Sequence, residues 1–276
     1  MLSQFNKKIR KTIKNSYLHL TEFPLKTLHD RPAQTPAKPS LIPPMIYQTW
    51  LNDQLGKTHL AEIEKFRASN LDLSFVLYTQ ENLERYMSEH WASHPIYPIF
   101  QNALFGPLKT DIFRYCILYE RGGYYFDINK GCHAISSLVS EDSTGIIAFE
   151  MTDCLIPPSP AESSKILYLE KYVLQWGMGF APKNIILERL IHNICELYPF
   201  YKNKIFKNPK NAIMQLTGPG MFTKTVREVL VESPDINIIQ ADIDFHGQGI
   251  FKMKKAEVRY FTMPAYTDFK NQAIVT

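Results

Sequence analysis

The chain has 276 residues, of which 45% are hydrophobic and 21% are charged, and its formal net charge is +4. This is enough to bury a substantial core, in one large domain or in one domain with an appendage. The four cysteines contain no CxxC pair, which excludes a zinc ribbon and a redox motif, and no apolar run is long enough to cross a membrane. The N-terminus lacks the apolar segment and cleavage site of a secretory signal, so we expect a cytoplasmic protein.

Residues 1–40 form a basic segment, with eight Lys and Arg against two acidic residues, a net charge of +6. Apolar residues recur there at steps of three or four, the pattern of one helix face: Leu2, Phe5, Ile9, Ile13, Tyr17 and Leu20. A basic amphipathic helix can lie on an anionic membrane surface, or it can pack its apolar stripe on the rest of the protein. Under the first reading, the protein is peripheral on the inner face of the membrane.

A proline-rich stretch follows the basic segment. Residues 30–44, DRPAQTPAKPSLIPP, contain five prolines and no apolar period. This composition predicts an extended linker. We therefore divide the chain into residues 1–40, a basic helix with a linker, and residues 41–276, one catalytic or binding domain.

Strand and helix patterns alternate after the linker. Residues 45–50 and 73–79 are predicted strands, and residues 59–70 and 81–87 have helical spacing. This alternation is typical of an α/β fold with a mainly parallel central sheet.

The next helix and strand carry the polar residues of interest. Residues 105–123 predict a helix that Gly122 and Gly123 end, and the aromatic strand YYFDI follows. Asp127 and Asn129 then lie two residues apart where that strand leaves the sheet, which is where open α/β sheets bind ligands. Asp111 and Arg114 are three apart on the helix, so they form either a surface ion pair or a pair that reaches the same pocket.

Four segments, in order over residues 42–226, resemble glycosyltransferase family 32. In chain order, they are IPPMIYQTW (42–50), KTDIFRYCILYERGGYYFDINKG (109–131), WGMGFAPKNIILERLI (176–191) and LTGPGMFTKTV (216–226). The resemblance implies a GT-A type fold, with one α/β domain built around a Rossmann-like nucleotide-binding sheet. It also implies transfer of a sugar from a nucleotide-diphosphate donor, with retention at the anomeric carbon.

The resemblance also implies roles for single residues. Trp50 matches a tryptophan that lies against the base, although a core tryptophan is the alternative. Asp111 and Arg114 match a pair that hydrogen-bonds the hydroxyls of the donor hexose. Tyr125 matches a tyrosine near the donor, and Asp127 matches the first acid of the Asp-x-Asp motif, beside the ribose and sugar. We therefore assign the catalytic role to Asp127, Asp111 and Arg114.

The expected cofactor is a divalent cation, Mn²⁺ or Mg²⁺, both of which prefer oxygen ligands. Asn129 stands where the family has its metal-binding second aspartate, and an amide oxygen brings no negative charge. Metal affinity should therefore be weak, or further ligands must compensate. Asp242, Asp244 and His246 alternate and would share one face of a strand. We name Asp127, Asn129 and His246 as the metal set, although a structural role for His246 is equally open.

Lys252, Lys254 and Lys255 either neutralise the leaving diphosphate or form a solvated charge run. No nucleophile is assigned.

Three functions compete. The first is a retaining hexosyltransferase that acts on a glycan or lipid-linked glycan of a surface polysaccharide, capsule or lipo-oligosaccharide. The second is a toxin-like protein glycosyltransferase, and the third is a degenerate, non-catalytic protein that binds sugar nucleotides or glycans. UDP-hexose and GDP-mannose fit equally well as donors, and no nucleic-acid partner is expected.

Overall fold

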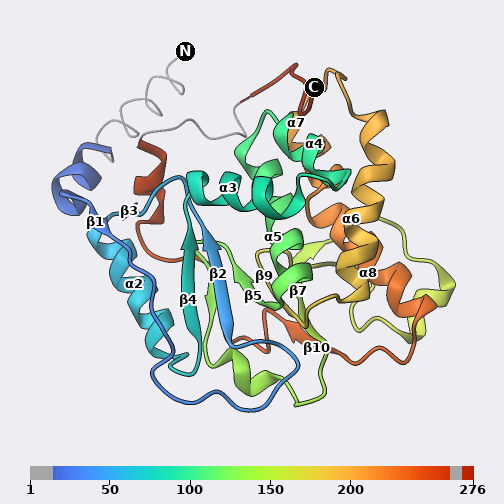
Figure 1. Ribbon diagram of the computed structural model, residues 1–276, viewed down its shortest axis with the longest axis horizontal. Coiled ribbons are helices and arrows are strands. Elements are labelled where there is room, and N and C mark those ends of the chain that lie inside the picture. Colours follow the sequence, from blue (N-terminus) through green and yellow to red (C-terminus); the bar gives the residue numbers. More distant parts are fainter. Residues whose placement is uncertain (1–14, 262–268) are drawn as a thin grey trace.

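A computed structural model describes residues 15–261 and 269–276, and a seven-stranded sheet forms its centre (Figure 1). The strand order is β10-β7-β9-β5-β2-β4, and β8 pairs with β7. The strands are β2 (Met45–Thr49), β4 (Ser74–Tyr78), β5 (Gly123–Phe126), β7 (Gly145–Asp153), β8 (Lys171–Val173), β9 (Gly177–Phe180) and β10 (Ile238–Ile243). Two strands of this sheet, β8 and β9, are antiparallel to the other five, which all run in one direction. The predicted α/β fold with a mainly parallel sheet is confirmed.

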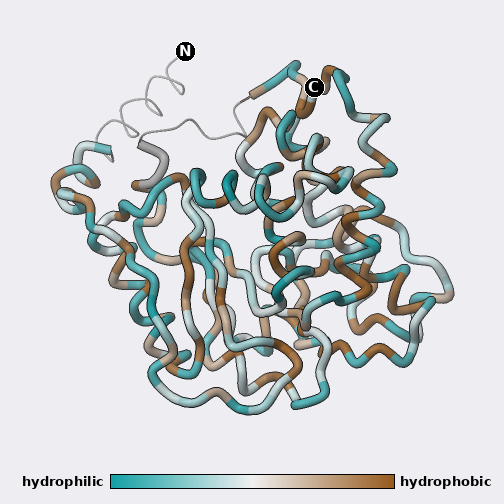
Figure 2. Tube along the Cα trace, viewed as in Figure 1, coloured by the Kyte–Doolittle hydropathy of each residue, from teal (hydrophilic) through white to brown (hydrophobic). Residues whose placement is uncertain are grey.

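Helices cover both faces of this sheet (Figure 1). One face carries α2 (Lys57–Ala68). The other carries α3 (Gln80–Trp91), α4 (Ile96–Gln101), α5 (Gly106–Arg121), α6 (Ile185–Leu197), α7 (Pro209–Leu216) and α8 (Pro219–Glu232). Tyr125 of β5 packs into the core under α5, while Tyr124 and Phe126 pack into the core under α2. The hydrophobic positions recur along the strands and the helices that cover them (Figure 2). Successive side chains of β5 thus point to opposite faces of the sheet, and both faces are buried, as is usual for parallel sheets.

The turn between α5 and β5 depends on a glycine. Pro107 lies in the first turn of α5, and Gly122 ends the helix with a φ of +66°. A Cβ atom on Gly122 would lie 2.6 Å from Cδ of Pro182. Only glycine combines this backbone conformation with so close a neighbour. The chain therefore enters β5 directly from α5, and Asp127 becomes the first residue beyond the strand.

The described part of the N-terminal segment packs on the domain. Residues 15–22 are helical, β1 (Lys26–Thr27) pairs with β3 (Gln54–Leu55), and Arg31 forms a β-bridge with Phe75 of β4. Leu18 is 3% exposed, whereas Tyr17 and Leu20 of the predicted stripe are 57% and 81% exposed. In this part of the helix, the predicted apolar stripe therefore does not face the domain.

The rest of the stripe lies outside the described residues, and the boundary at residue 40 stays a prediction. Within residues 15–261 and 269–276, no helix is both long and apolar enough to cross a membrane.

Candidate functional site

Three charged side chains meet at the carboxyl edge of the sheet. Nη2 of Arg114 lies 3.2 Å from Oδ1 of Asp111 and 3.2 Å from Oδ1 of Asp127. Asp111 and Arg114 are each only 5% exposed. The reading of these two residues as a surface ion pair is therefore wrong, and the pair reaches the strand end that carries Asp127.

The core of the protein holds Arg114 in place. Nη1 donates a hydrogen bond of 2.9 Å to the carbonyl of Gln175, and Cζ lies 4.4 Å above the ring of Tyr125. The Tyr125 hydroxyl is 2.8 Å from Oγ1 of Thr49, and the side chain is fully buried. Tyr125, predicted to lie near the donor, thus supports Arg114 from inside the core.

Asp111 is the deepest carboxylate of the site. Its Oδ2 accepts a hydrogen bond of 2.9 Å from Oγ1 of Thr217, and its Oδ1 accepts one of 3.1 Å from Nε2 of Gln175. Burial raises the pKa of Asp111, and Arg114, Thr217 and Gln175 only partly offset this effect. Burial opposes the charge on Arg114, but Tyr125, Asp127 and Asp111 outweigh it and raise the pKa of Arg114. Arg114 therefore stays charged between the two carboxylates.

Sequence reasoning missed Gln175 and Thr217. Gln175 directly precedes the segment 176–191, and Thr217 is the second residue of the segment 216–226. The sequence around them contains no motif that predicts a hydrogen bond to Asp111.

Backbone hydrogen bonds fix the loop that contains Asp127 and Asn129. The amide of Asp127 donates to the carbonyl of Trp176 at 2.8 Å, and the carbonyl of Asn129 accepts from the amide of Met253 at 3.0 Å. The Asp127 side chain is 34% exposed, and Asn129 is partly exposed. No hydrogen bond joins the Asn129 side chain to another described residue. Both polar side chains of the motif are therefore reachable from solvent.

A left-handed turn packs against this loop. Asp244, Phe245, His246 and Gly247 have φ values of +51°, +56°, +57° and +76°. After the turn, β11 (Gly249–Ile250) pairs with β6 (Gly131–Cys132), which directly follows the motif. The expectation that residues 242–246 form one strand face is wrong, because β10 ends at Ile243 and the chain reverses there to cover the motif.

The predicted metal set is only partly assembled. Asp127 and Asn129 share one loop, whereas Nδ1 of His246 lies 3.7 Å from Oδ2 of Asp242. The described residues contain no group of three or more His, Cys, Asp or Glu side chains that could hold a metal ion. Asp127 and Asn129 offer two oxygen ligands, so they fit a divalent cation whose other ligands come from a diphosphate and water. His246 as a ligand stays a prediction.

Trp50 follows β2, the strand next to β5, and its amide donates to the carbonyl of Tyr78 at 3.1 Å. Its ring is half-buried against the core under α2. This position is at the same sheet edge as Asp127, so contact with a base stays a prediction.

The three predicted lysines do not form one cluster. Nζ of Lys255 lies 2.8 Å from Oε1 of Glu22, and Lys254 interacts with Glu62. For these two lysines, the structure favours roles in the fold over contact with a diphosphate. Lys130 follows the motif instead: its Nζ donates to the carbonyl of Phe251 at 2.6 Å and lies 5.0 Å from the ring centre of Trp176.

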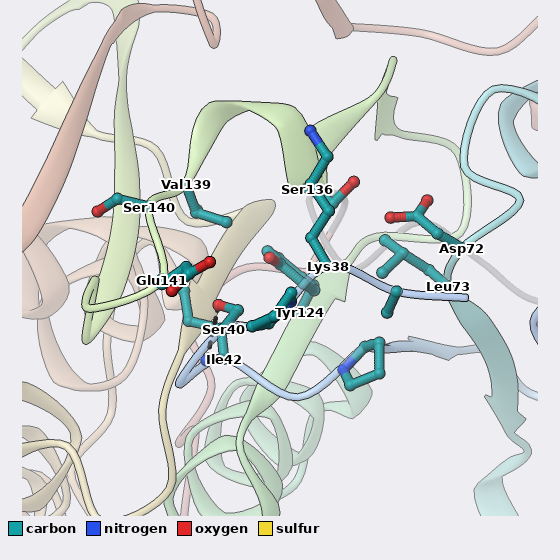
Figure 3. A pocket seen from close by; sticks show the side chains of 13 residues that line it. Lys38, Ser40, Ile42, Asp72, Leu73, Tyr124, Ser136, Val139, Ser140 and Glu141 are labelled. Carbon is teal, nitrogen blue, oxygen red and sulfur yellow. Dashed lines mark hydrogen bonds between the residues drawn. The ribbon is translucent and has the colours of Figure 1, made fainter. Parts of the chain in front are cut away.

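A cavity of about 350 Å³ lies at the opposite edge of the sheet (Figure 3). Tyr124 at the start of β5, Leu73 before β4 and Pro44 before β2 line it, together with Lys38 and Glu141. None of the predicted site residues lines this cavity. It is therefore separate from the site at the carboxyl edge.

Comparison with known proteins finds a glycosyltransferase family and mannosyltransferases. Residues 51–144 match the family described as "Glycosyltransferase sugar-binding region containing DXD motif". The chain is 25% identical over 217 residues to the initiation-specific alpha-1,6-mannosyltransferase of Candida albicans, covering 70% of this chain and 55% of that protein. It is 29% identical over 100 residues to the inositol phosphoceramide mannosyltransferase 1 of Schizosaccharomyces pombe, covering 35% of this chain and 31% of that protein.

The chain thus spans about half or less of the length of these curated relatives. A solved structure named "PaToxG Glycosyltransferase" is similar with a TM-score of 0.46 and 14% identity, over 84% of this chain and 78% of that one.

Proposed function

We propose that this chain is a glycosyltransferase of the kind whose DXD sugar-binding region residues 51–144 match, and that it transfers a hexose from a nucleotide-diphosphate sugar to a glycan or lipid-linked glycan. One observation carries the proposal: Arg114 bridges buried Asp111 and solvent-reachable Asp127 at the carboxyl edge of the sheet. This is the edge where α/β folds bind nucleotides. Ordered acceptors and donors at such an edge suit the hydroxyl groups of a sugar ring.

Three residues of the site, Asp127, Arg114 and Asn129, have a place in this reaction. Asp127 accepts hydrogen bonds from the donor, and Arg114 orients its carboxylate through the ion pair between them. Asp127 and Asn129 would hold Mn²⁺ or Mg²⁺ together with the diphosphate. When bound, such a cation offsets the negative charge that grows on the leaving diphosphate.

The relatives make a mannosyl donor the first candidate, because two of them are named mannosyltransferases. GDP-mannose is therefore tested before UDP-hexoses. One of those names refers to a glycolipid, inositol phosphoceramide, so a lipid-linked acceptor belongs in the panel beside glycans. A surface polysaccharide, capsule or lipo-oligosaccharide remains the proposed context.

Asn129 supports one second candidate, a non-catalytic protein that binds sugar nucleotides. A site that lacks one metal-binding carboxylate holds the metal less tightly, which is compatible with a protein that binds the sugar nucleotide but does not transfer the sugar.

Donor hydrolysis separates the two functions. Purified full-length protein is incubated with GDP-mannose or UDP-glucose and Mn²⁺, and release of GDP or UDP is measured beside a thermal-shift assay with the same donors. We expect both a rise in melting temperature and nucleotide release, and loss of release in Asp127→Ala with the fold intact. A thermal shift without release would support the binding protein, and neither signal with any donor would reject both functions.

A further inference from the structure

Glu150 is a carboxylate at the same sheet edge that neither the family resemblance nor the motif predicted. β7 pairs with β10 only as far as Phe149, so Glu150 is the first residue beyond that pairing. β9 lies between β7 and β5, so these two strands are about 10 Å apart, twice the ordinary strand spacing. β7 and β5 run in the same direction, so Glu150, in the second half of β7, and Asp127, directly after β5, both lie toward the carboxyl edge of the sheet.

Two charged residues of the motif loop act on Glu150. Burial raises the pKa of Glu150, Lys130 lowers it, and Asp127 raises it further, so its carboxylate interacts electrostatically with both motif neighbours. The side chain is only partly exposed, yet no hydrogen bond or ion pair joins it to another described residue. A sheltered carboxylate that makes no direct hydrogen bond or ion pair among the described residues costs stability, and such groups concentrate at functional sites.

The order of residues along the edge suggests what Glu150 meets. Trp50 follows β2, Asp127 follows β5, and Glu150 lies farther along the sheet, on β7. If the base lies at Trp50 and the diphosphate-sugar at Asp127, the sugar extends from Asp127 toward Glu150.

We propose that Glu150 is a catalytic residue whose carboxylate flanks the anomeric carbon of the donor sugar and stabilises the positive charge that develops there. The assignment rests on the proposed function. In the step, the bond between the anomeric carbon and the diphosphate oxygen breaks, and its electron pair goes to that oxygen. The acceptor oxygen, or water, then bonds to the anomeric carbon and loses its proton to the departing diphosphate. Glu150 remains ionised throughout and shields the face opposite the diphosphate, which favours retention.

Glu150→Gln tests this role at nearly constant shape. We expect kcat for donor hydrolysis to fall by about 100-fold or more, as when one preorganised charge is removed, while KM changes by less than about threefold. The melting temperature should stay equal or rise, because a sheltered charge is lost. Asp153→Asn is the matched control: it lies on the same strand, its side chain is 77% exposed, and it should keep wild-type kcat.

Glu150→Ala with added azide provides a second test. Azide should restore turnover and give a glycosyl azide with the anomeric configuration opposite to the donor, because it occupies the vacated face. Wild-type kcat in Glu150→Gln would overturn the Glu150 assignment and leave the proposed function intact. Loss of kcat together with a lower melting temperature and no azide rescue would also overturn it, in favour of a structural role. No turnover by the wild-type protein would reject the proposed function itself, and the assignment with it.

Discussion

The site depends on Arg114, because this side chain lies between the carboxylates of Asp111 and Asp127 and forms an ion pair with each of them. Asp111 is buried, and the neutral donors Thr217 and Gln175 cannot replace a full charge. Removing one partner of a buried ion pair leaves the other uncompensated, which costs more than the pair itself contributes.

Arg114→Ala should therefore lower the free energy of unfolding by about 3–5 kcal/mol, measured by urea denaturation. Arg121→Ala on the same helix is the control, and it should cost less than about 1 kcal/mol because Arg121 is exposed. A variant of Arg114 as stable as the control would show that Asp111 is protonated or solvated in the fold.

Asn129 sets the strength of the proposed metal site, since its amide brings no charge. Asn129→Asp should tighten Mn²⁺ binding in the presence of GDP by at least about tenfold, because ligand charge tunes such sites. Calorimetry with and without GDP measures both this change and the coupling between metal and nucleotide. Asn211→Asp, which adds the same charge to an exposed position of α7, should leave the affinity unchanged. Equal GDP affinity in excess chelator would reject a metal bridge.

At the scale of elements, the contact between the N-terminal helix and α2 depends on one carboxylate. Glu22 is fully buried and accepts hydrogen bonds from the amide of Thr58 at 2.7 Å and from Nζ of Lys255 at 2.8 Å. It therefore fills the place of an N-cap for α2, whose own N-cap residue, Gly56, offers no side chain. Through this contact, the segment before residue 30 becomes part of the domain surface.

The Glu22 contact should depend on pH. Burial opposes ionisation, but Lys255 and Thr58 outweigh it and lower the pKa of Glu22 below its ordinary value of 4.5. Because the folded pKa is the lower one, the stabilisation is present above pH 4.5 and is lost as the pH falls through the folded pKa. Glu22→Gln should lower the free energy of unfolding by about 1.5–3 kcal/mol at neutral pH.

Urea denaturation at neutral pH and at about pH 3 checks this prediction. The difference between Glu22→Gln and wild type should shrink at the lower pH. Exposed Glu89→Gln should change stability by less than about 0.5 kcal/mol at either pH. A difference that is independent of pH would mean that packing, not charge, carries the effect.

At the scale of the whole molecule, the basic residues gather at the N-terminus while the carboxyl edge of the sheet is rich in carboxylates. Residues 1–14 contain five of the Lys and Arg residues, namely Lys7, Lys8, Arg10, Lys11 and Lys14. We propose that this segment brings the enzyme to an anionic membrane surface on the cytoplasmic face, near a lipid-linked acceptor. A deletion to test this must stop at residue 14, because Leu18 and Glu22 are buried in the domain.

Deletion of residues 1–14 should reduce co-sedimentation with phosphatidylserine-containing liposomes, since each basic residue contributes about 1 kcal/mol near such a surface. High salt should reduce the binding of the full chain in the same way. Donor hydrolysis should be unaffected. Replacing exposed Lys202 and Lys204 by Gln removes charge elsewhere and serves as the control. Binding that neither the deletion nor salt changes would remove the membrane proposal.

The sequence by itself determined the elements and the positions of the polar residues along them. Alternating strand and helix patterns predicted the sheet, and Asp127 and Asn129 do follow a strand, as local spacing indicated. Spacing paired Asp111 with Arg114 on one helix face, and the resemblance indicated that this pair reaches the site and not the surface. Local periodicity succeeds here because hydrogen bonding and burial within one helix or strand depend on neighbours in the chain.

Only the tertiary structure decided which distant residues complete the site. Gln175 and Thr217 hydrogen-bond to Asp111 across 64 and 106 residues of chain, respectively, and Glu150 lies on β7, two strands away from β5. The left-handed turn at residues 244–247 likewise contradicted the strand that alternation predicted. These contacts depend on the strand order, with β9 inserted against the direction of its neighbours, and on where each strand ends. Neither is encoded in the spacing of residues within a single element, because both follow from packing among elements that are far apart in the chain.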